Sequence, residues 1–81
     1  MTPAEIRDGI IEALTSVAPD IEPETIRGNV NFRDQFDFDS MDFLNFVTAL
    51  HHRFGIDVPE ADYPRLMNLE GCVEYVTGKH A

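Results

Sequence analysis

The stretch Phe36-Asp37-Phe38-Asp39-Ser40-Met41-Asp42 ends a long irregular segment and opens the helix with the clearest apolar pattern in the sequence. Asp39 is predicted to be the N-cap, because its carboxylate can accept hydrogen bonds from the free backbone N–H groups of the first turn. Ser40 then takes the first helical position and Asp42 the third, as in a capping box. The Ser40 hydroxyl is not needed for capping and stands at the positive end of a helix dipole, which would stabilise a phosphate. A serine at a helix start is also ordinary, so a plain capping role is the alternative.

The helix behind this motif is predicted to run from 40 to about 54. Its core stripe follows the helical period and consists of Phe43, Val47, Leu50 and Phe54, with Phe46 on the flank. Gly55 can adopt the left-handed conformation that closes a helix. The opposite side, with His51 at its edge, carries Met41, Leu44, Asn45, Thr48 and His52. Met41 and Leu44 would be partly exposed beside Ser40, which makes this side a candidate docking face.

A first helix is predicted over 3–17, because Thr2-Pro3-Ala4-Glu5 forms a capping box with proline at the first helical position. Its inward stripe is Ile6, Ile10, Ala13, Leu14 and Val17. The segment 19–38 shows no sustained period, yet it is too apolar for a solvated linker. We expect a packed crossover loop with Phe32 and Phe36 inserted into the core.

The C-terminal part is predicted to hold a short helix over about 60–66, interrupted by Pro64, and a final helix over about 69–77. Asn68 would cap the final helix and Gly78 would end it, leaving Lys79-His80-Ala81 as a tail. The inward residues would be Leu69, Cys72, Val73 and Val76. We expect Cys72 to serve packing rather than chemistry.

Composition excludes several classes of protein. A chain of 81 residues suits one small domain, and its net charge of −9 would repel nucleic acid and anionic membranes. The same charge fits docking onto basic protein surfaces. No apolar run approaches the roughly 20 residues of a membrane span, and the N-terminus lacks the pattern of a signal peptide. A single cysteine rules out an internal disulfide and is compatible with the cytoplasm.

Asp39-Ser40-Met41, followed by an apolar helix that closes on Phe54-Gly55-Ile56, resembles the Asp-Ser-Leu motif of acyl carrier proteins. In that family the serine carries 4′-phosphopantetheine as a phosphodiester. The resemblance covers almost the whole chain and implies an all-α four-helix bundle. Such a bundle has three main helices, one short helix and a long loop between the first two helices. It also implies that the second helix is the main surface recognised by partner enzymes.

The chain departs from the family pattern at three places. Asp37 stands where glycine is common, and Met41 replaces leucine, a mild change of similar size. The second helix ends with His51-His52-Arg53. The corresponding end of the helix is usually acidic in fatty-acid-synthesis carriers, so this basic end favours a specialised pathway. The paired glycines typical of peptidyl carriers are absent before the serine, which favours an acyl over an aminoacyl cargo.

Other constellations predict no catalytic or metal site. The aspartates around Ser40 do not match a calcium loop, because Met41, Asp42 and Thr48 would take positions that require a ligand, glycine and glutamate. Adjacent histidines project about 100° apart on a helix and share a metal poorly. His51 and His52 lie three turns from Ser40, too far for a catalytic triad.

We therefore expect a discrete, monomeric acyl carrier protein, since the chain begins with Met and ends soon after the last helix. It would not be an enzyme. A phosphopantetheinyl transferase would modify Ser40, and acyl-loading and acyl-processing enzymes would dock beside it. The alternatives are an aminoacyl or peptidyl carrier and a small helical interaction module without a cofactor.

Overall fold

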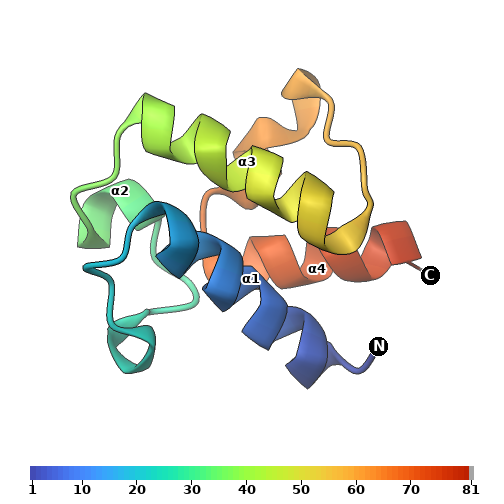
Figure 1. Cartoon of the computed structure of the whole chain (residues 1–81), viewed down its shortest axis with the longest axis horizontal. Helices are drawn as coiled ribbons and strands as arrows, with labels where there is room; N and C mark the ends of the chain where they lie inside the picture. The colour runs from blue at the N-terminus through green and yellow to red at the C-terminus, as the bar shows by residue number, and fades with distance from the viewer. Residues whose placement is uncertain (81) are drawn as a thin grey trace.

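The structure is a computed structural model that describes residues 1–80, and within them it contains helices and no strand (Figure 1). The elements are α1 (Pro3–Val17), the 3₁₀ helix η1 (Pro23–Thr25), α2 (Phe32–Gln35), α3 (Ser40–Phe54), the 3₁₀ helix η2 (Glu60–Leu66) and α4 (Leu69–His80). The predicted all-α bundle is confirmed. None of these helices is both long and apolar enough to cross a bilayer.

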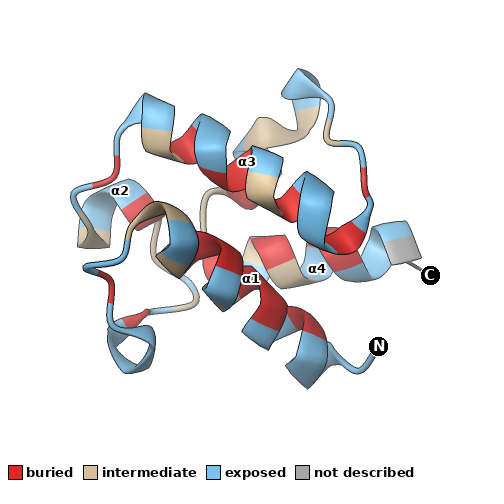
Figure 2. Cartoon of the chain, viewed as in Figure 1, coloured by how far each residue is buried: buried red, intermediate tan, exposed pale blue. Residues whose placement is uncertain are grey.

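The three long helices pack around one core, with α1 lying against both α3 and α4. Figure 2 shows their buried faces turned toward one another. The predicted stripes are buried in α1 and α3, except that Val17 is only half-buried. A glycine brings α1 and α3 close: a Cβ at Gly9 would lie 2.7 Å from Cζ of Phe54. The small residue therefore sets how near the end of α3 can approach α1.

Capping interactions fix the ends of the long helices. At the start of α1, Thr2 Oγ1 accepts from the Glu5 backbone N–H at 3.2 Å, and the Glu5 carboxylate accepts from the Thr2 N–H at 3.0 Å. The bond from the Thr2 backbone N–H holds the pKa of Glu5 below its ordinary value. Gly55 ends α3 with φ of 65°, the left-handed conformation expected of a C-cap glycine.

The prediction of an irregular loop over 19–38 was incomplete, because this segment contains η1 and α2. Elements of three or four residues are too short to display a period. Asn31 caps α2 by accepting from the Arg33 N–H at 2.9 Å. The Gln35 amide then binds both backbone groups of Arg27 at 2.8 Å and the carbonyl of Val30 at 2.9 Å. The crossover is therefore held by its own side chains, as packed loops commonly are.

The aromatic residues of the crossover were only partly predicted. Phe32 is buried as expected, but Phe36 is half-buried and Phe38 takes the second core position. The Phe32 ring lies 5.7 Å from that of Phe38 and 5.6 Å from that of Phe46, centroid to centroid. Such tilted contacts add to the stabilisation from burial. They fix α2 and the start of α3 to the same part of the core.

Helix α4 extends past the predicted end at 77, so Gly78 does not stop it and Lys79 and His80 are helical; Ala81 lies outside the described residues. Among residues 1–80 only Gly55 has a positive φ, so Gly78 does not form a left-handed C-cap. Asn68 caps the helix as predicted, because its Oδ1 accepts from the Gly71 N–H at 2.7 Å.

Two residues of α4 have packing roles that the helical period alone does not reveal. Gly71 is required by close approach, since a Cβ there would overlap the carbonyl oxygen of Arg65. Tyr75 is buried, and its hydroxyl donates to Asp62 Oδ2 at 2.6 Å. Burial, with this hydrogen bond, raises the pKa of Tyr75 to about 12. Cys72 is fully buried, which raises the pKa of its thiol and leaves it a packing residue.

Candidate functional site

The start of α3 leaves one hydroxyl without a capping role. Asp39 Oδ1 accepts from the Asp42 N–H at 2.8 Å, and Asp42 Oδ2 accepts from the Asp39 N–H at 3.1 Å, so the predicted capping box is present. Ser40 is the first helical residue and is exposed. The two carboxylates stabilise the helix end while the Ser40 Oγ remains accessible at its positive pole.

An arginine that the sequence did not single out lies beside this hydroxyl. Arg33 Nη2 donates to Ser40 Oγ at 2.8 Å, and Arg33 Nε donates to the carbonyl of Phe38 at 3.4 Å. The only available signal was compositional: Arg33 is the sole lysine or arginine between Arg27 and Arg53. Helix α2, which the apolar period did not predict, places it there.

Arg33 does not pair with the surrounding acids. In the described chain Arg53 pairs with Glu12 and the His51 ring lies near the Asp57 carboxylate, but no carboxylate lies within 4.0 Å of the Arg33 guanidinium. Its neighbours in the sequence are nevertheless strongly acidic. A guanidinium whose acceptors here are a hydroxyl and a carbonyl has donors available for an anion at Ser40.

A groove with a volume of about 280 Å³ adjoins this pair. Its walls are mainly apolar and come from α3, η2 and the η2–α4 junction. Ser40 and Arg33 line the groove together with Phe43, Leu44, Glu60, Tyr63 and Met67. The Phe43 and Tyr63 rings pack edge to face, with centroids 5.4 Å apart. The candidate site therefore combines a hydroxyl, a cation and an apolar depression.

The predicted docking face is exposed along α3. Met41 keeps 64% and Leu44 46% of its surface accessible, and Asn45, Thr48 and His52 are exposed as well. Two isolated apolar side chains need no explanation, but here they flank the one hydroxyl of the helix start that has no capping role. Their exposure agrees with the face predicted from the helical period; the docking role itself stays a prediction.

The basic end of α3 is partly engaged within the molecule. His51 Nδ1 lies 2.7 Å from the carbonyl of Ile56, and because a carbonyl only accepts, this nitrogen donates. The Asp57 carboxylate lies 3.4 Å from the same nitrogen. Arg53 pairs with Glu12 of α1. His52 is therefore the residue of this trio whose polar groups have the fewest intramolecular contacts.

Comparison with known proteins identifies the family of this chain. The family model described as a phosphopantetheine attachment site matches residues 8–76. The chain is 33% identical over 76 residues to an acyl carrier protein of Lactobacillus johnsonii, with 94% of each protein covered. It is 32% identical over 72 residues to one of Campylobacter hominis, covering 89% of this chain and 85% of that relative. The chain belongs to the acyl carrier protein family. Its cofactor is therefore covalently attached 4′-phosphopantetheine.

The residues of this carrier fit such a group at the start of α3. A phosphodiester needs an accessible hydroxyl oxygen to form its ester bond and hydrogen-bond donors for its charged oxygens. Ser40 supplies an exposed Oγ at a helix N-terminus, and Arg33 supplies a guanidinium already in contact with that oxygen. Both side chains face solvent, so burial does not shield either of them from the group.

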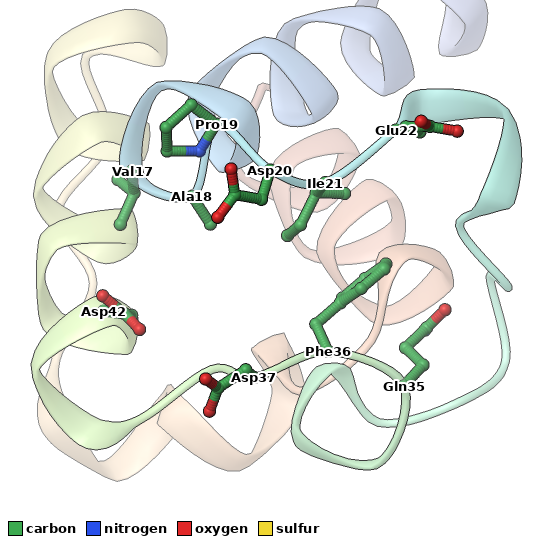
Figure 3. A pocket seen from close by; sticks show the side chains of 10 residues that line it. All are labelled: Val17, Ala18, Pro19, Asp20, Ile21, Glu22, Gln35, Phe36, Asp37 and Asp42. Atoms are coloured by element: carbon green, nitrogen blue, oxygen red, sulfur yellow. The ribbon is translucent and has the colours of Figure 1, made fainter.

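A second depression of this acyl carrier protein lies on the other side of the α3 start and has a volume of about 460 Å³. Figure 3 shows the carboxylates of Asp20, Asp37 and Asp42 around its opening, with Ile21 and Phe36 to one side. Within the part of the chain that the structure describes, no three acidic, histidine or cysteine side chains are arranged to hold a metal ion. Asp37, which stands where the family commonly has glycine, lines this acidic depression.

Proposed function

We propose that this carrier holds an acyl group as a thioester on 4′-phosphopantetheine attached to Ser40, and presents it to partner enzymes. The observation that carries the proposal is the exposed Ser40 hydroxyl, freed from capping by Asp39 and Asp42. The attached group supplies a terminal thiol for the thioester, and the protein supplies position. Asp39 holds the first turn in place, and Met41 flanks the attachment point.

The proposed partners dock on the exposed side of α3. A phosphopantetheinyl transferase and the acyl-loading and acyl-processing enzymes would contact the face made of Met41, Leu44, Asn45, Thr48 and His52. The net charge of −9 supports partners whose docking surfaces are basic. In this proposal the chain is not itself a catalyst, because its role is to deliver a bound group to active sites on other proteins.

We also propose a specialised pathway with an acyl cargo. The support is the His51-His52-Arg53 sequence at the end of α3 and the absence of paired glycines before Ser40. A panel of fatty acids and amino acids, offered with candidate activating enzymes to the modified protein, separates the two kinds of cargo. Loading with amino acids alone would contradict the acyl proposal.

Intact-protein mass spectrometry tests the attachment residue. The chain is incubated with coenzyme A, Mg²⁺ and a broad-specificity phosphopantetheinyl transferase, beside Ser40→Ala and Ser16→Ala. Ser16 is the only other serine, and its hydroxyl donates to the Ala13 carbonyl within α1. We expect one phosphopantetheine on the wild type and on Ser16→Ala, and none on Ser40→Ala. Modification of folded Ser40→Ala, or of none of the three, would overturn the proposal.

A further inference from the structure

We propose that Arg33 is the residue that binds the phosphodiester of the attached arm; this inference rests on Ser40 being the attachment residue. The guanidinium already touches the oxygen that would become the ester oxygen, with Nη2 donating to Ser40 Oγ at 2.8 Å. The non-bridging oxygens of a phosphodiester lie one bond beyond that oxygen. They would therefore come within reach of the same guanidinium without a change of the backbone.

Arg33 is held in this place by the fold. Its backbone N–H is bound by the Asn31 side chain at 2.9 Å, and its neighbour Phe32 anchors α2 in the core. Its Nε is directed at the carbonyl of Phe38, two residues before Ser40, at 3.4 Å. A side chain fixed at both ends loses less conformational freedom when it binds an anion than a free surface arginine does.

The charge around Ser40 explains why a cation is needed there. A phosphodiester adds a negative charge beside a stretch that already carries Asp34, Asp37, Asp39 and Asp42. The two capping carboxylates are committed to backbone N–H groups, and Arg33 has no carboxylate within 4.0 Å in the described chain. Its charge is thus available to offset the repulsion. Exchange of a neutral hydroxyl acceptor for an anionic one also strengthens the hydrogen bond.

The position of Arg33 gives it a further effect on the arm. Arg33 and Ser40 both line the apolar groove that contains Phe43, Leu44 and Tyr63. The phosphate is the first group of the arm, so its binding to Arg33 would fix the point from which the arm leaves the protein. Arg33 is in this sense a positioning residue, which acts on the attached group and carries out no chemistry.

A cycle of modification and mutation tests the inference. Melting temperatures are measured for the unmodified and modified forms of the wild type, Arg33→Gln and Arg7→Gln. Arg7 is the matched control, because it is an exposed arginine on α1 whose loss changes the net charge equally. Modification changes the melting temperature of each protein, and this change should be about 2 to 6 °C more positive in the wild type than in Arg33→Gln. Arg7→Gln should match the wild type.

Two further readouts separate phosphate binding from a structural role. The difference between the wild type and Arg33→Gln in the melting-temperature change should fall by about half or more in roughly 1 M NaCl, where the screening length is about 3 Å. The ³¹P resonance of modified Arg33→Gln should differ from that of the wild type, whereas Arg7→Gln should not change it. If Arg33 had a purely structural role, Arg33→Gln would lower the melting temperatures of the modified and unmodified forms equally. The ³¹P resonance would then stay where it is in the wild type.

The results of this cycle distinguish a failure of the inference on Arg33 from a failure of the proposed function. If the wild type is modified but Arg33→Gln shows the same temperature change and the same ³¹P resonance, the inference on Arg33 is wrong and Ser40 remains the attachment residue. If the folded wild type is not modified at all, the proposed function fails and this inference fails with it.

Discussion

Removal of the Asp39 carboxylate should destabilise the protein, whereas removal of the neighbouring hydroxyl should not. In Asp39→Ala the Asp42 N–H loses its acceptor at 2.8 Å, and the N-terminus of α3 loses a negative charge. Loss of an N-cap costs about 1 kcal/mol, and the charge–dipole interaction adds about 0.3–1 kcal/mol. We therefore expect a loss of about 1.5 kcal/mol, which lowers the melting temperature of a domain this size by about 6 to 12 °C.

The two comparison variants divide this loss into its parts. Asp39→Asn keeps a capping oxygen and removes only the charge, so we expect a loss of about 0.5 kcal/mol. Ser40→Ala removes a hydroxyl whose bonding partner is the exposed Arg33 side chain, and we expect a change within about 0.5 kcal/mol. Urea unfolding of the unmodified proteins, followed by circular dichroism, measures all three. If Ser40→Ala costs as much as Asp39→Ala, Ser40 is itself the cap and its hydroxyl is not available for modification.

Three further predictions concern the docking face and α4. Leu44→Glu should leave the melting temperature nearly unchanged but reduce acyl loading by the partner enzyme at least about tenfold, as expected for a docking residue. Thr77 of α4 is also exposed, so Thr77→Glu serves as the control. Normal loading of Leu44→Glu, or an equal loss in Thr77→Glu, would count against the docking face. Gly71→Ala should lower the free energy of unfolding by about 1–3 kcal/mol because its Cβ meets a carbonyl oxygen, whereas Gly78→Ala, with nothing within 4 Å of its Cβ, should raise it by up to about 1 kcal/mol. Similar shifts of the melting temperature for both variants in calorimetry would contradict this difference in packing. Tyr75 has its pKa raised to about 12, so folding stability should fall as the pH rises from about 10 toward 12. An ultraviolet titration in which Tyr75 ionises near 10 in the folded protein would contradict this.

The features of α3 could be predicted because each has a strong local cause. The apolar period selects the buried side, a carboxylate before the first turn caps the helix, and a glycine after the last turn allows the left-handed closure. The two capping signals act over four residues or fewer, and the apolar period lies within the helix itself. They place Ser40 at the first helical position without any knowledge of the rest of the fold.

The crossover could not be predicted to the same depth, because its structure depends on contacts distant in sequence. The choice of Phe38 over Phe36 for the core is decided by the Phe32 and Phe46 rings, not by a period. The segment is also tied to the η2–α4 junction, where the Phe32 N–H donates to the Met67 carbonyl at 2.8 Å. A pattern within the loop contains no trace of that bond.

Arg33 was missed for the same reason, and its placement shows how the site depends on the whole domain. Its contact with Ser40 spans seven residues and requires both the short helix α2 and the buried ring of Phe32. The capping carboxylates, by contrast, act within the first turn of α3. Since the cap is independent of Ser40, chemistry on that hydroxyl would leave the helix start intact. Since Arg33 is positioned by the core, a charge added at Ser40 would meet a cation that is already in place.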